Sequence, residues 1–163
     1  MRRVAIVAAL TVVLAAGASA QKPKGTTGAM KTAPVMFMPS EATWSPAPAG
    51  LPEGGEVTVL EGDPSQPGPF TLQLRLPDGY KVAPHWHPTD ERQTLVKGTL
   101  MMGMGDKWVE SEMKELTPGA FVMLPKHNSH YVQAKGEAIL QVQATGPFDL
   151  TYVNPSDDPR KKQ

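Results

Sequence analysis

The sequence contains no cysteine among its 163 residues, so disulfides, thiol catalysis and cysteine-ligated metal sites are excluded. It also has no excess of either charge, with 16 Lys and Arg against 16 Asp and Glu. The longest basic block is Arg160-Lys161-Lys162, which is too short to follow a nucleic-acid backbone. Nucleic acid is therefore not an expected partner.

Sustained helical periodicity is likewise missing, because apolar residues are nowhere spaced at helical intervals over three turns. Proline and glycine are abundant, at 17 and 15 residues, and they predict many turns. A chain of about 150 residues buries roughly 68–70% of the surface exposed by its unfolded form. We therefore expect one domain whose core needs no disulfide or structural metal.

The first 20 residues have the pattern of a secretory signal peptide. Arg2 and Arg3 precede the apolar stretch Val4–Leu14, and Ala18-Ser19-Ala20 provides the small residues of a cleavage site. The apolar stretch is shorter than the roughly 20 residues of a membrane-spanning helix. We expect cleavage before Gln21, a periplasmic or secreted mature protein, and no membrane contact after cleavage.

The remaining chain divides into three parts. Residues 21–50 are expected to be a mostly irregular lead-in with one short strand, Val35–Met38, because Lys, Gly and Thr dominate its first half. Residues 51–153 are expected to form a β-barrel, and residues 154–163 a charged C-terminal tail.

Short apolar runs alternate with Pro, Gly and Asp through the predicted barrel. Phe70–Leu76 shows the two-residue period of a half-buried strand, with apolar residues at even positions. Chain reversals are predicted at Gly62-Asp63-Pro64, Pro77-Asp78-Gly79, Lys97-Gly98 and Thr117-Pro118-Gly119. The strands expected are Val35–Met38, Glu56–Leu60, Phe70–Leu76, Tyr80–His87, Arg92–Lys97, Thr99–Met104, Ala120–Leu124, Tyr131–Ala134, Ala138–Ala144 and Phe148–Val153. This pattern indicates an all-β sandwich or barrel, and closure would hide the strand edges.

All four histidines lie between positions 85 and 130. His85 and His87 are two residues apart on a predicted strand, so both leave the same face about 6.6 Å apart along the backbone. Glu91 opens the next strand, whose antiparallel return would bring its carboxylate toward these imidazoles. His130 opens a later strand. Three imidazoles and one carboxylate suit one divalent transition metal, namely Fe, Mn, Ni, Zn or Cu, whereas calcium would need more oxygen ligands.

The spacing of these residues resembles the first motif of the cupin superfamily: Gly79, five residues, His85-Trp86-His87, three residues, Glu91, six residues and Gly98. Gly119, Pro125 and His130 stand at the spacing of the second motif. The resemblance implies a small jelly-roll-like barrel, the double-stranded β-helix, with His85, His87, Glu91 and His130 as metal ligands. A homodimer is the usual cupin arrangement. The stretch from Gly146 to Arg160 also resembles the tail of small exported bacterial cupins without an assigned reaction.

Two positions depart from the second motif. His127 stands where the family has a glycine in a tight turn, so either His127 adopts the left-handed conformation or the turn differs. Ala134 replaces an asparagine that many cupins lack. His127 is a candidate proton donor beside the metal, and the alternative is a histidine in a solvent-exposed turn.

Gln93 is the second candidate catalytic residue, because it lies two residues beyond Glu91 and should share the inward face. It could donate to a substrate, to dioxygen or to Glu91, or it could be only a polar core residue. Four protein ligands would leave about two positions open on a six-coordinate metal. Fe(II) would then favour a dioxygenase acting on a small organic acid or diketone. Mn, Ni or Zn would favour an isomerase, lyase or decarboxylase, and a non-catalytic ligand-binding module is the remaining alternative.

Overall fold

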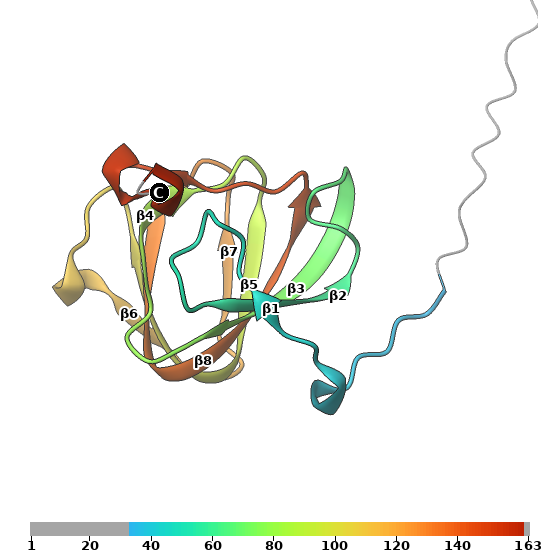
Figure 1. Cartoon of the computed structure of the whole chain (residues 1–163). Coiled ribbons are helices and arrows are strands. Elements are labelled where there is room, and N and C mark those ends of the chain that lie inside the picture. Colours follow the sequence, from blue (N-terminus) through green and yellow to red (C-terminus); the bar gives the residue numbers. More distant parts are fainter. Residues whose placement is uncertain (1–32, 162–163) are drawn as a thin grey trace, which may run out of the picture. The chain divides into compact units, whose positions relative to one another are not determined.

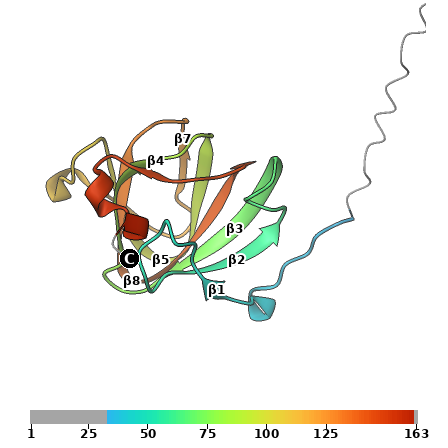
Figure 2. The ribbon, with the colours of Figure 1, turned by 45° about the horizontal axis from the view of Figure 1, so that its top comes forward.

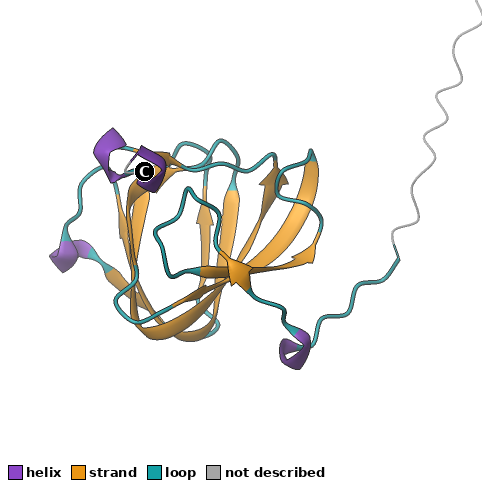
Figure 3. Ribbon diagram, viewed as in Figure 1, coloured by secondary structure: helices purple, strands orange, loops and turns teal. Residues whose placement is uncertain are grey.

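The computed structural model describes residues 33–161, and its fold is a single curled antiparallel β-sheet (Figures 1 and 3). The predicted signal peptide and the first part of the lead-in, up to residue 32, lie outside the described residues. Cleavage and export therefore stay predictions. The homodimer is likewise still a prediction. Within residues 33–161, no helix has the length and apolar character needed to cross a membrane.

Nine strands and four short 3-10 helices follow one another along the described chain. They are η1 (Pro39–Glu41), β1 (Ser45–Pro46), β2 (Glu56–Glu61), β3 (Gly68–Leu76), β4 (Lys81–Trp86), β5 (Glu91–Met104), η2 (Glu110–Glu112), β6 (Lys114–Leu116), β7 (Phe121–Leu124), β8 (His130–Gly146), β9 (Thr151–Tyr152), η3 (Pro155–Asp157) and η4 (Pro159–Lys161).

The two longest strands, β5 and β8, form the centre of the sheet. They pair antiparallel from Glu91 opposite Ala144 to Met104 opposite His130. On its other side, β8 pairs with β4 through its first residues and with β3 through its second half. β6 and β7 pair with the two ends of β5, β2 continues the sheet beyond β3, and β9 continues it beyond β4. Figure 2 shows that the sheet curls into a barrel-like wall, which confirms the predicted all-β fold.

Alternation of side chains places the core inside this curl. On β3, Phe70, Leu72 and Leu76 are buried, as the two-residue period predicted. They face buried residues of the other strands, among which Leu95 and Leu140 are almost fully inaccessible. Contacts among these apolar side chains hold the strands that carry the histidines together.

Several of the predicted elements differ from the structure. β5 and β8 are each continuous where the sequence predicted two shorter strands, and Lys97-Gly98 is an irregularity within β5 rather than a chain reversal. Val35–Met38 is not a strand: Val35 and Met36 are 61% and 85% exposed, and their backbone finds no partner strand among the described residues. The predicted strand Phe148–Val153 is reduced to β9, because the amide of Phe148 donates to the carbonyl of Pro64, which lies outside the strands. β1 and β6 were not predicted.

Gly98 explains why β5 continues. Its φ is +81°, and a Cβ added there would collide with the carbonyl oxygen of Glu137 on β8. From the local sequence alone, such a glycine predicts a turn. In the structure, Gly98 instead lets β5 and β8 approach closely at a bulge. Gly136 also has a positive φ, +70°, but a Cβ added there would meet no atom within 4 Å.

The two glycines form a matched pair for a stability measurement. We expect Gly136→Ala to lower the free energy of unfolding by about 1 kcal/mol, from the left-handed conformation alone. Gly98→Ala adds a steric collision, so we expect about 3 kcal/mol. At this chain length each kcal/mol shifts the melting temperature by roughly 2–4 °C, which thermal unfolding resolves. Equal losses for the two variants would contradict a steric role for Gly98.

Candidate metal centre

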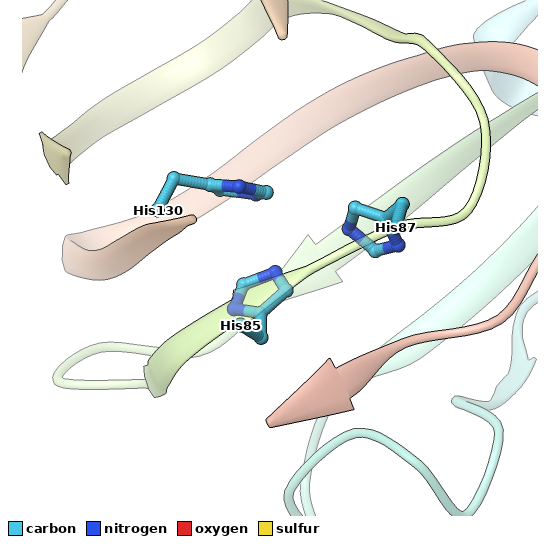
Figure 4. Close-up of side chains that lie close together, drawn as sticks. All are labelled: His85, His87 and His130. Carbon is cyan, nitrogen blue, oxygen red and sulfur yellow. The ribbon is translucent and has the colours of Figure 1, made fainter. Parts of the chain in front are cut away.

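Three buried imidazoles, from β4, the residue after it and β8, point toward one another (Figure 4). His85 lies near the end of β4, His87 directly follows it, and His130 opens β8 opposite His85. One ring nitrogen of each lies within 4.8 Å of the others, and the ring centroids of His85 and His130 are 4.2 Å apart. We call these three residues the histidine cluster.

Backbone carbonyls fix the proton of every ring in the histidine cluster. The Nδ1 atom of each imidazole lies within hydrogen-bond distance of a carbonyl oxygen, which can only accept. Nδ1 therefore carries the proton, and Nε2 keeps a free lone pair. The three carbonyls, in chain order of the histidines, belong to Ala83 at 2.8 Å, Asp149 at 2.8 Å and Asn128 at 3.3 Å. Such contacts are typical of histidines that bind metals.

Burial also keeps the imidazoles of His85 and His130 neutral. Desolvation, followed by the nearby His130 and His87, holds the pKa of His85 well below its usual value. Desolvation likewise lowers the pKa of His130, against an opposing effect of Glu91. Since only the neutral imidazole donates a lone pair to a metal, His85 and His130 can coordinate a cation at neutral pH.

Glu91 completes the site as the first residue of β5. Its side chain is buried, and Oε2 lies 3.5 Å from Nε2 of both His87 and His130. Within the described chain, neither Glu91 Oε2 nor His130 Nε2 has a hydrogen-bond partner. A buried, unpartnered carboxylate is costly unless a cation compensates it. The unpartnered atoms and the mixed nitrogen and oxygen donors therefore fit a divalent transition metal.

The two other candidate residues lie in different places. Gln93 is 4% exposed, faces the same cavity as Glu91, and its Oε1 atom has no partner among the described residues. His127 is exposed, and its ring lies 4.6 Å from that of Trp86. Its φ of +61° shows that His127 adopts the left-handed conformation in place of the family's glycine. The structure thus brings Gln93, but not the His127 ring, to the histidine cluster.

A cavity of about 440 Å³ opens from the histidine cluster into the barrel. Its walls are mainly aliphatic, and Val59 at 48% exposure marks a side that is open to solvent. Arg160 is the only cationic side chain among the lining residues. Apolar wall residues include Leu72, Leu74, Val82, Val132, Leu140 and Val142. This shape and polarity suit a small, largely apolar ligand.

The sequence did not predict that the segment following β8 contacts His87. Phe148 stacks on His87, with ring centroids 4.4 Å apart and an interplanar angle of 12°. The carbonyl of Asp149 accepts a hydrogen bond from His87 Nδ1, and Arg160 lies beside this segment. A backbone carbonyl has no residue-type signature, so only the resemblance of the Gly146–Arg160 stretch to other cupins pointed to this part of the chain.

The chain matches the family model described as Domain of unknown function (DUF4437) over residues 14–151. No curated protein matches it. Among solved structures, the polyketide cyclase RemF from Streptomyces resistomycificus has a TM-score of 0.64 at 14% identity, with 77% of this chain and 89% of RemF covered. An RmlC-like cupin from Shewanella frigidimarina NCIMB 400 has a TM-score of 0.53 at 16% identity, covering 71% and 94%.

The DMSP lyase DddQ from Ruegeria pomeroyi DSS-3 has a TM-score of 0.54 at 18% identity, with 69% of this chain and 61% of DddQ covered. At these identities the similarity concerns the fold. It agrees with the curled antiparallel sheet and with the motif that carries His85, His87 and Glu91. The chain therefore belongs to the DUF4437 family, and its fold is a single-domain β-barrel of the cupin type.

Proposed function

We propose that this protein binds one divalent transition-metal ion at the histidine cluster and Glu91, and acts as an enzyme on a small organic acid or diketone. The observation that carries the proposal is the set of three buried imidazoles whose protons are all fixed on Nδ1, facing an unpartnered carboxylate. Four convergent metal-ligating side chains are not expected in a purely structural core, because burying polar atoms without a partner is costly.

The cavity supports the substrate class. Its only lining cation, Arg160, already donates to Asp158, to Asp149 and to the carbonyl of Leu150. No cationic side chain among the lining residues is left to bind a second anionic group, so the substrate's oxygen atoms are expected to bind at the metal. The remainder of the substrate would contact aliphatic walls. A keto acid or diketone with an apolar body meets both conditions, whereas a sugar phosphate does not.

The donor set also supports the reaction class. When Glu91 and the imidazoles are ligands, Asp149 is the only other potential base among the lining residues, and its carboxylate is engaged by Arg160. Chemistry that needs a protein base is then disfavoured. A bound Fe(II) ion would supply neighbouring coordination sites for substrate and dioxygen, and a dioxygenase places both oxygen atoms in the organic products without another reductant. Gln93 would orient the bound substrate by donating through its amide.

A second candidate function follows if Glu91 does not bind the metal. Its Oε2 lies close enough to the histidine cluster to take a proton from a substrate held there. The metal would then act as a Lewis acid in an isomerase, lyase or decarboxylase. The fold similarity to RemF, named a polyketide cyclase, and to DddQ, named a DMSP lyase, supports this candidate.

Metal removal is the first test. We expect treatment with a chelator to lower the melting temperature of the purified protein by roughly 5–10 °C, since a ligand at 100 times its Kd stabilises by about 2.7 kcal/mol. Re-addition of one equivalent of Fe(II), Mn(II) or Zn(II) should restore it. Elemental analysis of the protein as purified identifies the resident ion. A melting temperature that does not respond to the chelator or to any of these ions would contradict the metal site.

Turnover is the second test. The Fe(II)-loaded protein is incubated with a panel of keto acids and diketones while oxygen uptake and products are measured. Oxygen uptake coupled to substrate loss supports the dioxygenase. Substrate conversion without oxygen uptake contradicts it in favour of the Lewis-acid enzyme. Binding without conversion across the panel contradicts both enzymes in favour of a ligand-binding module.

A further inference from the structure

We propose that Arg160, in the C-terminal tail, is a positioning residue for His87. It would hold the Asp149–Leu150 peptide in place, and the carbonyl of that peptide in turn holds the His87 ring. This inference rests on the proposed metal site. It gives the C-terminal tail, for which the sequence suggested only charge, a part in the metal centre.

His87 depends on a distant segment for its orientation, unlike the other members of the histidine cluster. His85 and His130 donate to carbonyls only two residues away in their own segments. The Nδ1 atom of His87 instead donates to Asp149, which is 62 residues further along the chain. His87 also lies just beyond the end of β4. Its ring is therefore only as well placed as the segment that carries Asp149.

That segment lies between β8 and β9, outside both strands. The amide of Phe148 donates to the carbonyl of Pro64 and holds one end. Arg160 holds the other end: Nη1 donates to Asp149 Oδ1 at 3.1 Å, and Nη2 donates to the carbonyl of Leu150 at 3.0 Å. The guanidinium thus contacts both Asp149 and Leu150, and the carbonyl between them accepts the hydrogen bond from His87.

The guanidinium is itself fixed by Asp158. Two parallel hydrogen bonds of 2.9 Å join Arg160 Nε and Nη2 to the two carboxylate oxygens of Asp158, which is 8% exposed. Bidentate pairing of this kind fixes direction as well as distance. An isolated, exposed ion pair contributes little. Here, however, four side-chain hydrogen bonds act together at the rim of the cavity.

Loss of these bonds should affect metal affinity more than folding. When the Asp149 carbonyl is free to shift, the His87 imidazole can rotate or move its proton to Nε2, the nitrogen that would face the metal. Replacement of groups that orient a metal ligand typically costs about 10–100-fold in affinity. Arg160 acts through one further residue, so we expect an effect of about 10-fold.

The test compares Arg160→Met with Arg75→Met in the otherwise unchanged protein. Arg75 on β3 is a matched control, because it also forms an ion pair, with Glu56 on β2, and does not line the cavity. The side chain of Arg75 is 33% exposed and that of Arg160 is 38% exposed. Co(II) affinity and the visible Co(II) spectrum are measured by titration. In the metal-free protein, the ¹⁵N shifts of the His87 ring report which nitrogen carries the proton. We expect R160M to weaken Co(II) binding about 10-fold, change the spectrum and mix the two tautomers.

R75M should leave these three measurements as in the wild type. Wild-type affinity, spectrum and tautomer in R160M, or equal losses in R75M, would overturn the inference. Asp149→Asn gives a second variant that removes one charge and keeps the carbonyl, and we expect a smaller change in the same direction. A wild-type protein that fails to bind Co(II) would instead overturn the proposed metal site, so the two failures are distinguishable.

Discussion

His130→Ala is expected to abolish metal binding and, with it, turnover. His130 is the most deeply buried member of the histidine cluster, at 1% exposure, and its Nε2 atom has no partner among the described residues. The substitution removes one of three nitrogen donors, so two imidazoles and Glu91 remain and one side of the cation is left without a protein ligand. Affinity should fall by more than about 100-fold, since even groups that only orient a ligand are worth about 10–100-fold. A Co(II) titration and the metal content of the purified variant measure this.

His127→Ala is the matched control for this substitution. It removes an imidazole only three positions away, but one that is exposed and packed near Trp86. We expect its metal affinity to equal that of the wild type. Thermal unfolding of H130A in the presence of chelator shows whether the variant still folds. A folded H130A that binds Co(II) at wild-type affinity would mean that the three imidazoles do not form the metal site.

Glu91→Gln is expected to reduce oxygen uptake by more than about 100-fold, equivalent to about 2.7 kcal/mol in the activation free energy. The amide keeps the shape of the side chain but removes the negative charge that faces two Nε2 atoms at 3.5 Å. A neutral amide oxygen is a weaker donor to a divalent cation. Co(II) affinity should therefore fall as well, by about 10-fold or more.

The combination of the two measurements separates the candidate functions. Loss of both affinity and turnover supports Glu91 as a metal ligand and the dioxygenase. Full affinity with no turnover would identify Glu91 as a base and favour the Lewis-acid enzyme. Glu137→Gln is the control, because Glu137 is an exposed carboxylate paired with Lys97, away from the cavity. We expect it to change neither affinity nor turnover.

Much of the fold followed from local patterns. The even-numbered apolar residues of β3 turned inward, since alternation is a property of any strand. The two-residue spacing of His85 and His87 and the strand that starts at His130 likewise predicted that these imidazoles would meet, and their ring nitrogens lie within 4.8 Å of one another. Such predictions succeed because they depend only on strand geometry and on a motif.

Other features could not be read from short stretches. Gly98 has the residue type of a turn, but its conformation serves a bulge that only the pairing of β5 with β8 creates. Val35–Met38 has the apolar character of a strand, but a strand forms only where a partner accepts its hydrogen bonds. In both cases a non-local contact decided the conformation.

Residue types and their spacing thus established an all-β chain and four candidate donors, because alternation and the cupin motif are local in the sequence. The tertiary structure alone decided which ring nitrogen each histidine presents, where the cavity opens and which contacts hold Arg160 beside it. The cavity depends on side chains from several strands. The orientations of the imidazoles and of Arg160 depend on backbone carbonyls, which are the same in every residue. Only the folded chain determines which carbonyl meets which side chain.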